Sequence, residues 1–107
     1  MTTTVPDWLV WTPGATAEFF NEQEARAMAD RIGGIVFHKS EERNMLDRRE
    51  IAKLCEHFSP TTLAGIIADL EGSSDVNAPR VTSQAEKALI ANVGEAEAEE
   101  LIGKAKV

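Results

Sequence analysis

The spacing of apolar residues indicates a β-hairpin near the start of the chain. The run Trp8-Leu9-Val10-Trp11 is rich in residues that favour strands. Pro13-Gly14 follows directly and favours a turn before the next apolar pair, Phe19-Phe20. Two strand-like runs that flank a turn signal predict two paired strands.

A helical pattern follows the predicted hairpin. Asn21 stands three residues before Glu24, which is typical of a helix start, and four apolar residues then recur at the spacing of one helical face. They are Ala25, Met28, Ala29 and Ile32. Gly33-Gly34 ends this helix, and the β-branched run 35–38 is long enough to pair with the hairpin. Residues 1–38 therefore predict a ββαβ unit with a small antiparallel or mixed sheet.

The middle of the chain predicts a helix pair over residues 45–71. After a polar loop at 39–44, Asp47 and Glu50 repeat the helix-start signature. Ser59-Pro60 then ends that helix and begins another, because Ser suits the capping position and Pro the first helical position. The apolar faces of the two helices are Ile51, Leu54, Cys55 and Phe58, and Leu63, Ile66, Ile67 and Leu70.

The last third of the chain predicts a C-terminal helix or helix pair over residues 82–104. Residues 72–79 have the composition of a turn-forming linker, and Ser83 with Glu86 forms a third helix-start signature. Glycine costs about 1 kcal/mol relative to alanine inside a helix, so Gly94 leaves open whether the helix breaks there. We expect the tail, residues 103–107, to fray. The whole pattern predicts one small α+β domain, residues 1–107, with a ββαβ unit followed by three or four helices.

Composition and charge exclude several classes of protein. The chain has 107 residues, with 18 Asp and Glu against 11 Lys and Arg and a formal net charge of −7. This length supports one modest core, which excludes a large multi-domain enzyme. The sequence shows neither an apolar run long enough to span a membrane nor the pattern of a signal peptide, so we expect a cytoplasmic protein without a membrane partner.

Candidate catalytic residues are few, so we expect neither an enzyme nor a cofactor. Cys55 lies on an apolar helical face and is interpreted as a core residue, while His57 points roughly 160° away on the same helix. Neither His38 nor His57 lies in a metal-ligand spacing, and no metal is expected. Asp75-Val76-Asn77 resembles the start of a calcium loop but lacks its glycine and closing glutamate, which predicts a simple turn.

Residues 49–71 resemble the helix-turn-helix of bacterial transcriptional regulators. The likeness lies in Glu50-Ile51-Ala52-Lys53-Leu54 and Ser59-Pro60-Thr61-Thr62-Leu63. It implies phosphate contacts from Arg43, Arg48, Arg49 and Lys53, and dimerisation through Leu89, Val93, Leu101 and Ile102. The second helix, however, offers Asp69 and no Arg, Lys, Asn or Gln to base edges, and the net charge repels phosphates. Two amphipathic helices packed nearly antiparallel are the simpler interpretation, and direct nucleic-acid binding is not expected.

The tryptophans and an acidic segment suggest a protein-binding surface instead. In a strand, Trp8 and Trp11 lie on opposite faces, so either one indole is exposed as an interface anchor or both lie in the core on the two sides of a thin sheet. Asp69, Glu71 and Asp75 lie in a segment without Lys or Arg. Our leading hypothesis is a small acidic intracellular adaptor or inhibitor, such as a phage-style or immunity-type inhibitor, that occupies a basic, nucleic-acid-binding cleft of its partner.

Overall fold

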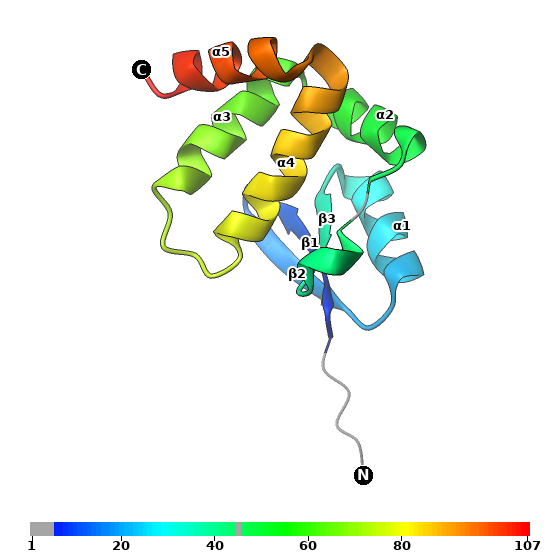
Figure 1. Ribbon diagram of the computed structural model, residues 1–107. Helices are drawn as coiled ribbons and strands as arrows, with labels where there is room; N and C mark the ends of the chain where they lie inside the picture. Colours follow the sequence, from blue (N-terminus) through cyan, green and yellow to red (C-terminus); the bar gives the residue numbers. More distant parts are fainter. Residues whose placement is uncertain (1–5, 45) are drawn as a thin grey trace.

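The computed structural model describes residues 6–44 and 46–107 and has the predicted α+β architecture (Figure 1). Its N-terminal part is the expected ββαβ unit, and the sheet is antiparallel with strand order β2-β1-β3. The elements are β1 (Trp8–Thr12), β2 (Ala15–Phe19), α1 (Glu22–Ile32) and β3 (Ile35–His38). The hairpin is therefore confirmed, and β1 is the central strand.

Both ends of α1 follow from local chemistry. The side-chain oxygen of Asn21 accepts a hydrogen bond of 2.8 Å from the backbone N–H of Glu24, which satisfies one of the free donors of the first turn. Gly33 ends the helix in the left-handed conformation with a φ of 72°. Glycine adopts this conformation without the clash that a Cβ atom brings, so the chain can turn at once into β3.

In the described part of the chain, the sheet is followed by a short 3₁₀-helix in the polar loop, η1 (Glu41–Arg43), and then by four α-helices. The α-helices are α2 (Arg48–His57), α3 (Pro60–Glu71), α4 (Ala78–Val93) and α5 (Glu95–Ala105). The predicted caps of α2 and α3 are confirmed, because Asp47 and Ser59 each accept a hydrogen bond from the backbone N–H three residues later. The four helices of the second half agree with the predicted three or four.

The C-terminal region differs from the sequence prediction in where its first helix begins and in how far its last helix extends. The helix begins at Ala78 rather than at residue 82, and Ser83 lies in its interior. Pro79 sits in the first turn, where its missing N–H costs nothing, so the helix starts within the expected linker. Gly94, with a φ of 91°, separates α4 from α5, which is the helix-pair alternative of the sequence prediction. Helix α5 stays helical to Ala105, whereas fraying of residues 103–107 was expected.

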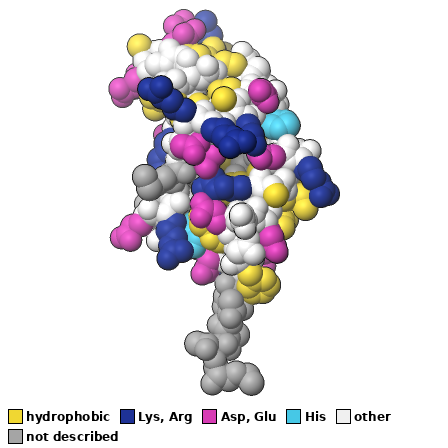
Figure 2. Space-filling view, turned by 90° about the vertical axis from the view of Figure 1, so that its right-hand side faces the viewer, with side chains coloured by type: hydrophobic (Ala, Val, Ile, Leu, Met, Phe, Trp, Pro, Cys, Tyr) yellow, Lys and Arg dark blue, Asp and Glu magenta, His cyan; other side chains and the backbone are white. Residues whose placement is uncertain are grey.

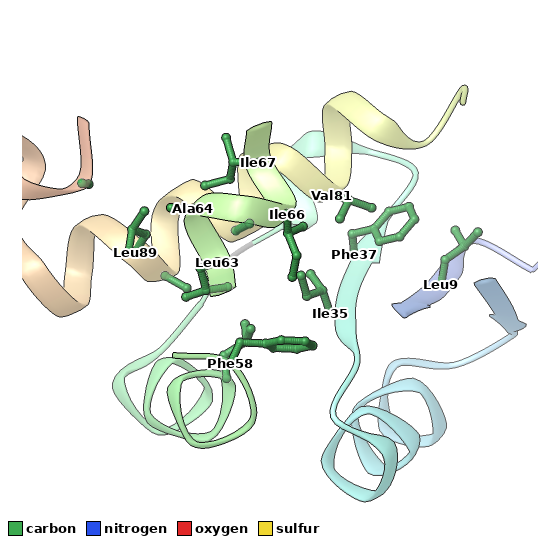
Figure 3. Close-up of a cluster of buried hydrophobic side chains, with 14 residues drawn as sticks. Leu9, Ile35, Phe37, Phe58, Leu63, Ala64, Ile66, Ile67, Val81 and Leu89 are labelled. Atoms are coloured by element: carbon green, nitrogen blue, oxygen red, sulfur yellow. The ribbon is translucent and has the colours of Figure 1, made fainter. Parts of the chain in front are cut away.

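The sheet separates two hydrophobic clusters. The larger cluster lies between the sheet and the C-terminal helices and includes Phe37, Leu63 and Leu89 (Figure 3). The smaller one joins α1 to the other face of the sheet through Trp8, Val10, Ala25, Ala29 and Val36. The two tryptophans therefore lie on opposite sides of the sheet, as the strand alternation predicts. Ile32 was expected on the apolar face of α1, but it is half exposed, because α1 meets the sheet through its alanines.

The helix packing also bears on the alternative functions. Helix α3 packs mainly on α4 and α5, and α4 lies between α2 and α3 (Figure 1). The nearly antiparallel pairing expected for α2 and α3 is therefore wrong. The apolar residues considered for dimerisation belong to the core: Leu89 is buried, and Val93, Leu101 and Ile102 pack against it. Among the described residues, no helix has the length and apolar character needed to span a membrane.

Candidate binding site

Trp8 is not available as a surface anchor. Only 7% of the residue is exposed, and its ring meets the His38 ring edge-on at a centroid distance of 4.7 Å. The guanidinium of Arg26 lies 5.6 Å from the centre of the Trp8 ring, within the range of a cation–π contact. Trp8 thus joins α1 to the sheet. Its predicted role as a contact for a partner protein is wrong, because the side chain is buried.

Trp11 lies at a surface hollow with an acidic residue from a distant part of the chain. The indole is half-buried on the side of the sheet that faces α3. Together with Asp69 it lines a hollow of about 430 Å³ between the hairpin turn and α3. The other lining residues are Pro13, Thr62, Gly65 and Ile66. We call this site the Trp11 hollow; it brings together one tryptophan and one carboxylate that the sequence had marked separately.

The helical pattern of α3 explains why these residues face outward. Leu63, Ile66 and Ile67 anchor the buried face of the helix, so Thr62 and Asp69 stay exposed. Gly65 lies between them along the helix, and a Cβ atom built on it would meet nothing within 4 Å. Gly65 lines the hollow and contributes no side chain to it.

The other predicted acidic residues have contacts of their own. Glu71 forms an ion pair with Lys106 at 2.6 Å, which offsets its charge. The carboxylate of Asp75 accepts a hydrogen bond of 2.9 Å from the backbone N–H of Asn77, so this segment forms the predicted turn. Of the three acids, only Asp69 lies in the Trp11 hollow.

A second, larger concavity lies between α1 and α2, and sequence reasoning missed it. This α1–α2 groove has a volume of about 860 Å³ and an apolar floor that includes Ala29, Val36 and Leu54. Acidic and basic side chains alternate over the same face of the molecule (Figure 2). Residue spacing along a helix predicts contacts within that helix but not contacts between two helices, so the sequence carried no signal for this groove.

Ion pairs between α1 and α2 cross the groove and offset the charges of several of its lining side chains. Arg26 of α1 lies 2.6 Å from Glu50 of α2, and Asp30 of α1 lies 2.6 Å from Lys53 of α2. Burial raises the pKa of the Glu50 carboxyl, against the opposing attraction of Arg26. The groove therefore lies between two helices that are joined across it by ion pairs between their own charged groups.

The basic residues proposed for DNA contacts differ in their surroundings. Lys53 is held in its ion pair with Asp30, and Arg49 lines the α1–α2 groove. Arg43 and Arg48 are exposed. Of the four, Lys53 is the residue whose charge is offset by an ion pair among the described residues.

The structure places Cys55 and His57, the residues considered for reactive chemistry, in different surroundings. Cys55 is half-buried rather than fully in the core, and burial raises the pKa of its thiol, which disfavours the nucleophilic thiolate. His57 is exposed, and its ring lies near Gly33 at the end of α1. Within residues 6–44 and 46–107, no three His, Cys, Asp or Glu side chains are grouped to hold a metal ion.

Comparison with known proteins adds no functional assignment. No family model, curated protein or solved structure matches the chain.

Proposed function

We propose that this protein is a small acidic protein-binding module, an adaptor or inhibitor, that receives a basic side chain of its partner in the Trp11 hollow. The observation that carries the proposal is that Trp11 of β1 and Asp69 of α3 line the same open hollow. An aromatic ring beside a carboxylate is a combination suited to binding a cation.

The two groups would act on the cation in different ways. A cation over an indole ring gains about 0.5–2 kcal/mol, with the larger value where water is excluded. The Asp69 carboxylate adds ionic attraction and accepts hydrogen bonds. A planar guanidinium can stack on the indole while it bonds to a carboxylate, so Arg suits this site better than Lys. Gly65 lines the hollow, and the space beside it is open.

The charge of the whole molecule favours the same kind of partner. The net charge is −7, and α5 exposes Glu95, Glu97, Glu99 and Glu100. An acidic surface of this kind accelerates encounters with basic proteins and repels nucleic acids. In the inhibitor form of the proposal, the protein occupies a basic cleft that otherwise holds nucleic acid. We do not extend the proposal to DNA binding by residues 49–71, because Asp69 lies on the outer side of the helix that would read the bases.

A matched pair of charge reversals tests the proposal. A partner is first recovered from a bacterial lysate treated with nuclease, and its affinity is then measured for the wild type and two variants. Asp69→Lys places a like charge in the Trp11 hollow, so we expect at least about tenfold weaker binding, equal to about 1.4 kcal/mol. Glu97→Lys changes the net charge equally at an exposed position of α5 and is expected to have a much smaller effect.

Two results would contradict the proposal. Equal weakening by Asp69→Lys and Glu97→Lys would show that only net charge matters. Recovery of partners that depends on intact DNA would point instead to the helix-turn-helix alternative, with Arg43 and Arg48 as the first residues to replace.

A further inference from the structure

The two edges of the sheet differ in how their backbone groups are satisfied. At β3, the N–H of His38 donates to the side-chain oxygen of Asn44, and the Asn44 amide donates back to the His38 carbonyl at 2.8 Å. Two residues earlier in β3, the carbonyl of Val36 accepts a hydrogen bond of 3.0 Å from the Gln84 side-chain amide. Two side-chain amides thus take the place of a neighbouring strand at this edge.

These bonds also establish which backbone groups of β2 face outward. Because His38 and Val36 bond away from β1, their partners Trp8 and Val10 bond toward β2, where they oppose Phe19 and Ala17. In an antiparallel ladder the intervening residues point the other way. The N–H and C=O groups of Thr16 and Glu18 therefore face away from β1, along the outer edge of β2.

This outer edge, which we call the free β2 edge, is open to solvent. Residues 15–18 are all exposed, and no element in the described part of the chain pairs with that side of β2. An unpaired, exposed strand edge offers regularly spaced donors and acceptors to another chain. The strand contains neither Pro nor Lys, two residues that commonly block such pairing.

We propose that the free β2 edge binds an extended segment of the partner protein by strand addition. This inference rests on the proposed function and states how the partner docks. Glu18 lies opposite Leu9 and Thr16 opposite Trp11, so the side chains of Glu18 and Thr16 share the face of the sheet that carries Trp11. A basic residue of the added strand beside Glu18 would thus lie on the same face as the Trp11 hollow.

Charge favours a basic partner over a second copy of this chain. In an antiparallel pairing of two β2 strands centred on Ala17, Glu18 of each copy would lie diagonally next to Glu18 of the other, where like charges repel. Each copy also carries a net charge of −7. An extended segment with Lys or Arg at alternate positions has the complementary charge and meets neither penalty.

The inference can be tested with peptides selected on the wild-type protein from a displayed library of random peptides. Thr16→Pro removes an outward N–H and leaves the β1–β2 bonds in place, so we expect at least about tenfold weaker binding. Thr16→Val keeps the N–H and should bind as the wild type does. Glu18→Lys leaves the backbone unchanged and should weaken the binding of basic peptides more than Glu97→Lys does.

Several outcomes would overturn strand addition. The first is a library that yields no binder. The second is that Thr16→Pro and Thr16→Val bind with equal affinity while Glu18→Lys binds as the wild type does. The third is a wild-type dimer that Thr16→Pro dissociates, since the occupant of the edge would then be a second copy of this chain. The result also separates the two proposals. Loss of partner binding in Asp69→Lys but not in Thr16→Pro or Glu18→Lys would reject strand addition and keep the Trp11 hollow as the binding site.

Discussion

At the scale of single residues, Asn44 and Gln84 protect one edge of the sheet to different degrees. Asn44 satisfies both the N–H and the C=O of His38, whereas Gln84 satisfies only the carbonyl of Val36. The Gln84 side-chain oxygen is buried and has no hydrogen-bond partner among the described residues. Neither role could be predicted from the sequence, because a lone Asn in a loop and a lone Gln in a helix have the same pattern as ordinary surface residues.

Glu50 gives a prediction about pH at the same scale. Burial outweighs Arg26 and raises the pKa of this carboxyl, so the folded state favours its protonated form. The folded protein therefore binds more protons than the unfolded chain just above the ordinary pKa of 4.5, and the contribution of Glu50 to stability falls as pH rises through the raised value. Glu50→Gln lacks this loss.

We expect the stability of Glu50→Gln to rise relative to wild type as pH increases above 4.5, by less than about 1 kcal/mol because the carboxyl is partly exposed. Urea unfolding at a series of pH values measures the difference. Glu97→Gln, which makes the same change in charge at an exposed position of α5, serves as the control. Stability curves of Glu50→Gln and wild type that stay parallel across this range would show that burial does not govern Glu50.

At the scale of elements, the end of α1 depends on a single glycine. Gly33 has a φ of 72°, and a Cβ atom there would lie 3.0 Å from the ring of His57 in α2. An alanine at this position would be strained by about 1–2 kcal/mol in the left-handed conformation. Its Cβ atom would also lie so close to the His57 ring that the ring would have to shift. The glycine thus fixes both the turn into β3 and the approach of α2.

Replacing Gly33 with Ala should therefore destabilise the fold by at least about 1 kcal/mol in chemical unfolding. Gly103→Ala is the matched control, because Gly103 lies in α5, and a Cβ atom there would meet nothing within 4 Å. Its helical propensity should make that variant as stable as wild type or more stable by up to about 1 kcal/mol. Wild-type stability in Gly33→Ala would mean that neither the conformation nor the His57 contact matters.

The elements also show where sequence patterns predict structure well. Turn and cap signals at Pro13-Gly14, Asn21 and Ser59 act over a few residues, so the hairpin and the starts of α1 and α3 could be predicted. The third helix-start pattern, Ser83 with Glu86, occurs inside α4, where Val81 before it is already buried in the core. Burial extended the helix toward the N-terminus, and a local pattern cannot report that tertiary effect.

At the scale of the whole molecule, the candidate site arises from packing between distant segments. Trp11 and Asp69 could each be selected from the sequence, as a potential anchor and as part of an acidic segment. Their meeting in one hollow could not, because it depends on α3 packing against α4 and α5 on one side of the sheet. The α1–α2 groove is another such case, since its ion pairs join separate helices.

The two tryptophans allow a direct test of the central claim, that the Trp11 hollow binds a basic side chain. A ¹⁵N-labelled sample is titrated with a capped Gly-Arg-Gly peptide, and the same peptide with Glu in place of Arg serves as the control. We predict that the Trp11 indole N–H and the backbone amides of Gly65 and Asp69 shift with the Arg peptide only. The indole N–H of Trp8, buried on the other side of the sheet, should stay unchanged. Shifts confined to residues of the α1–α2 groove, with no change at Trp11, would contradict the account.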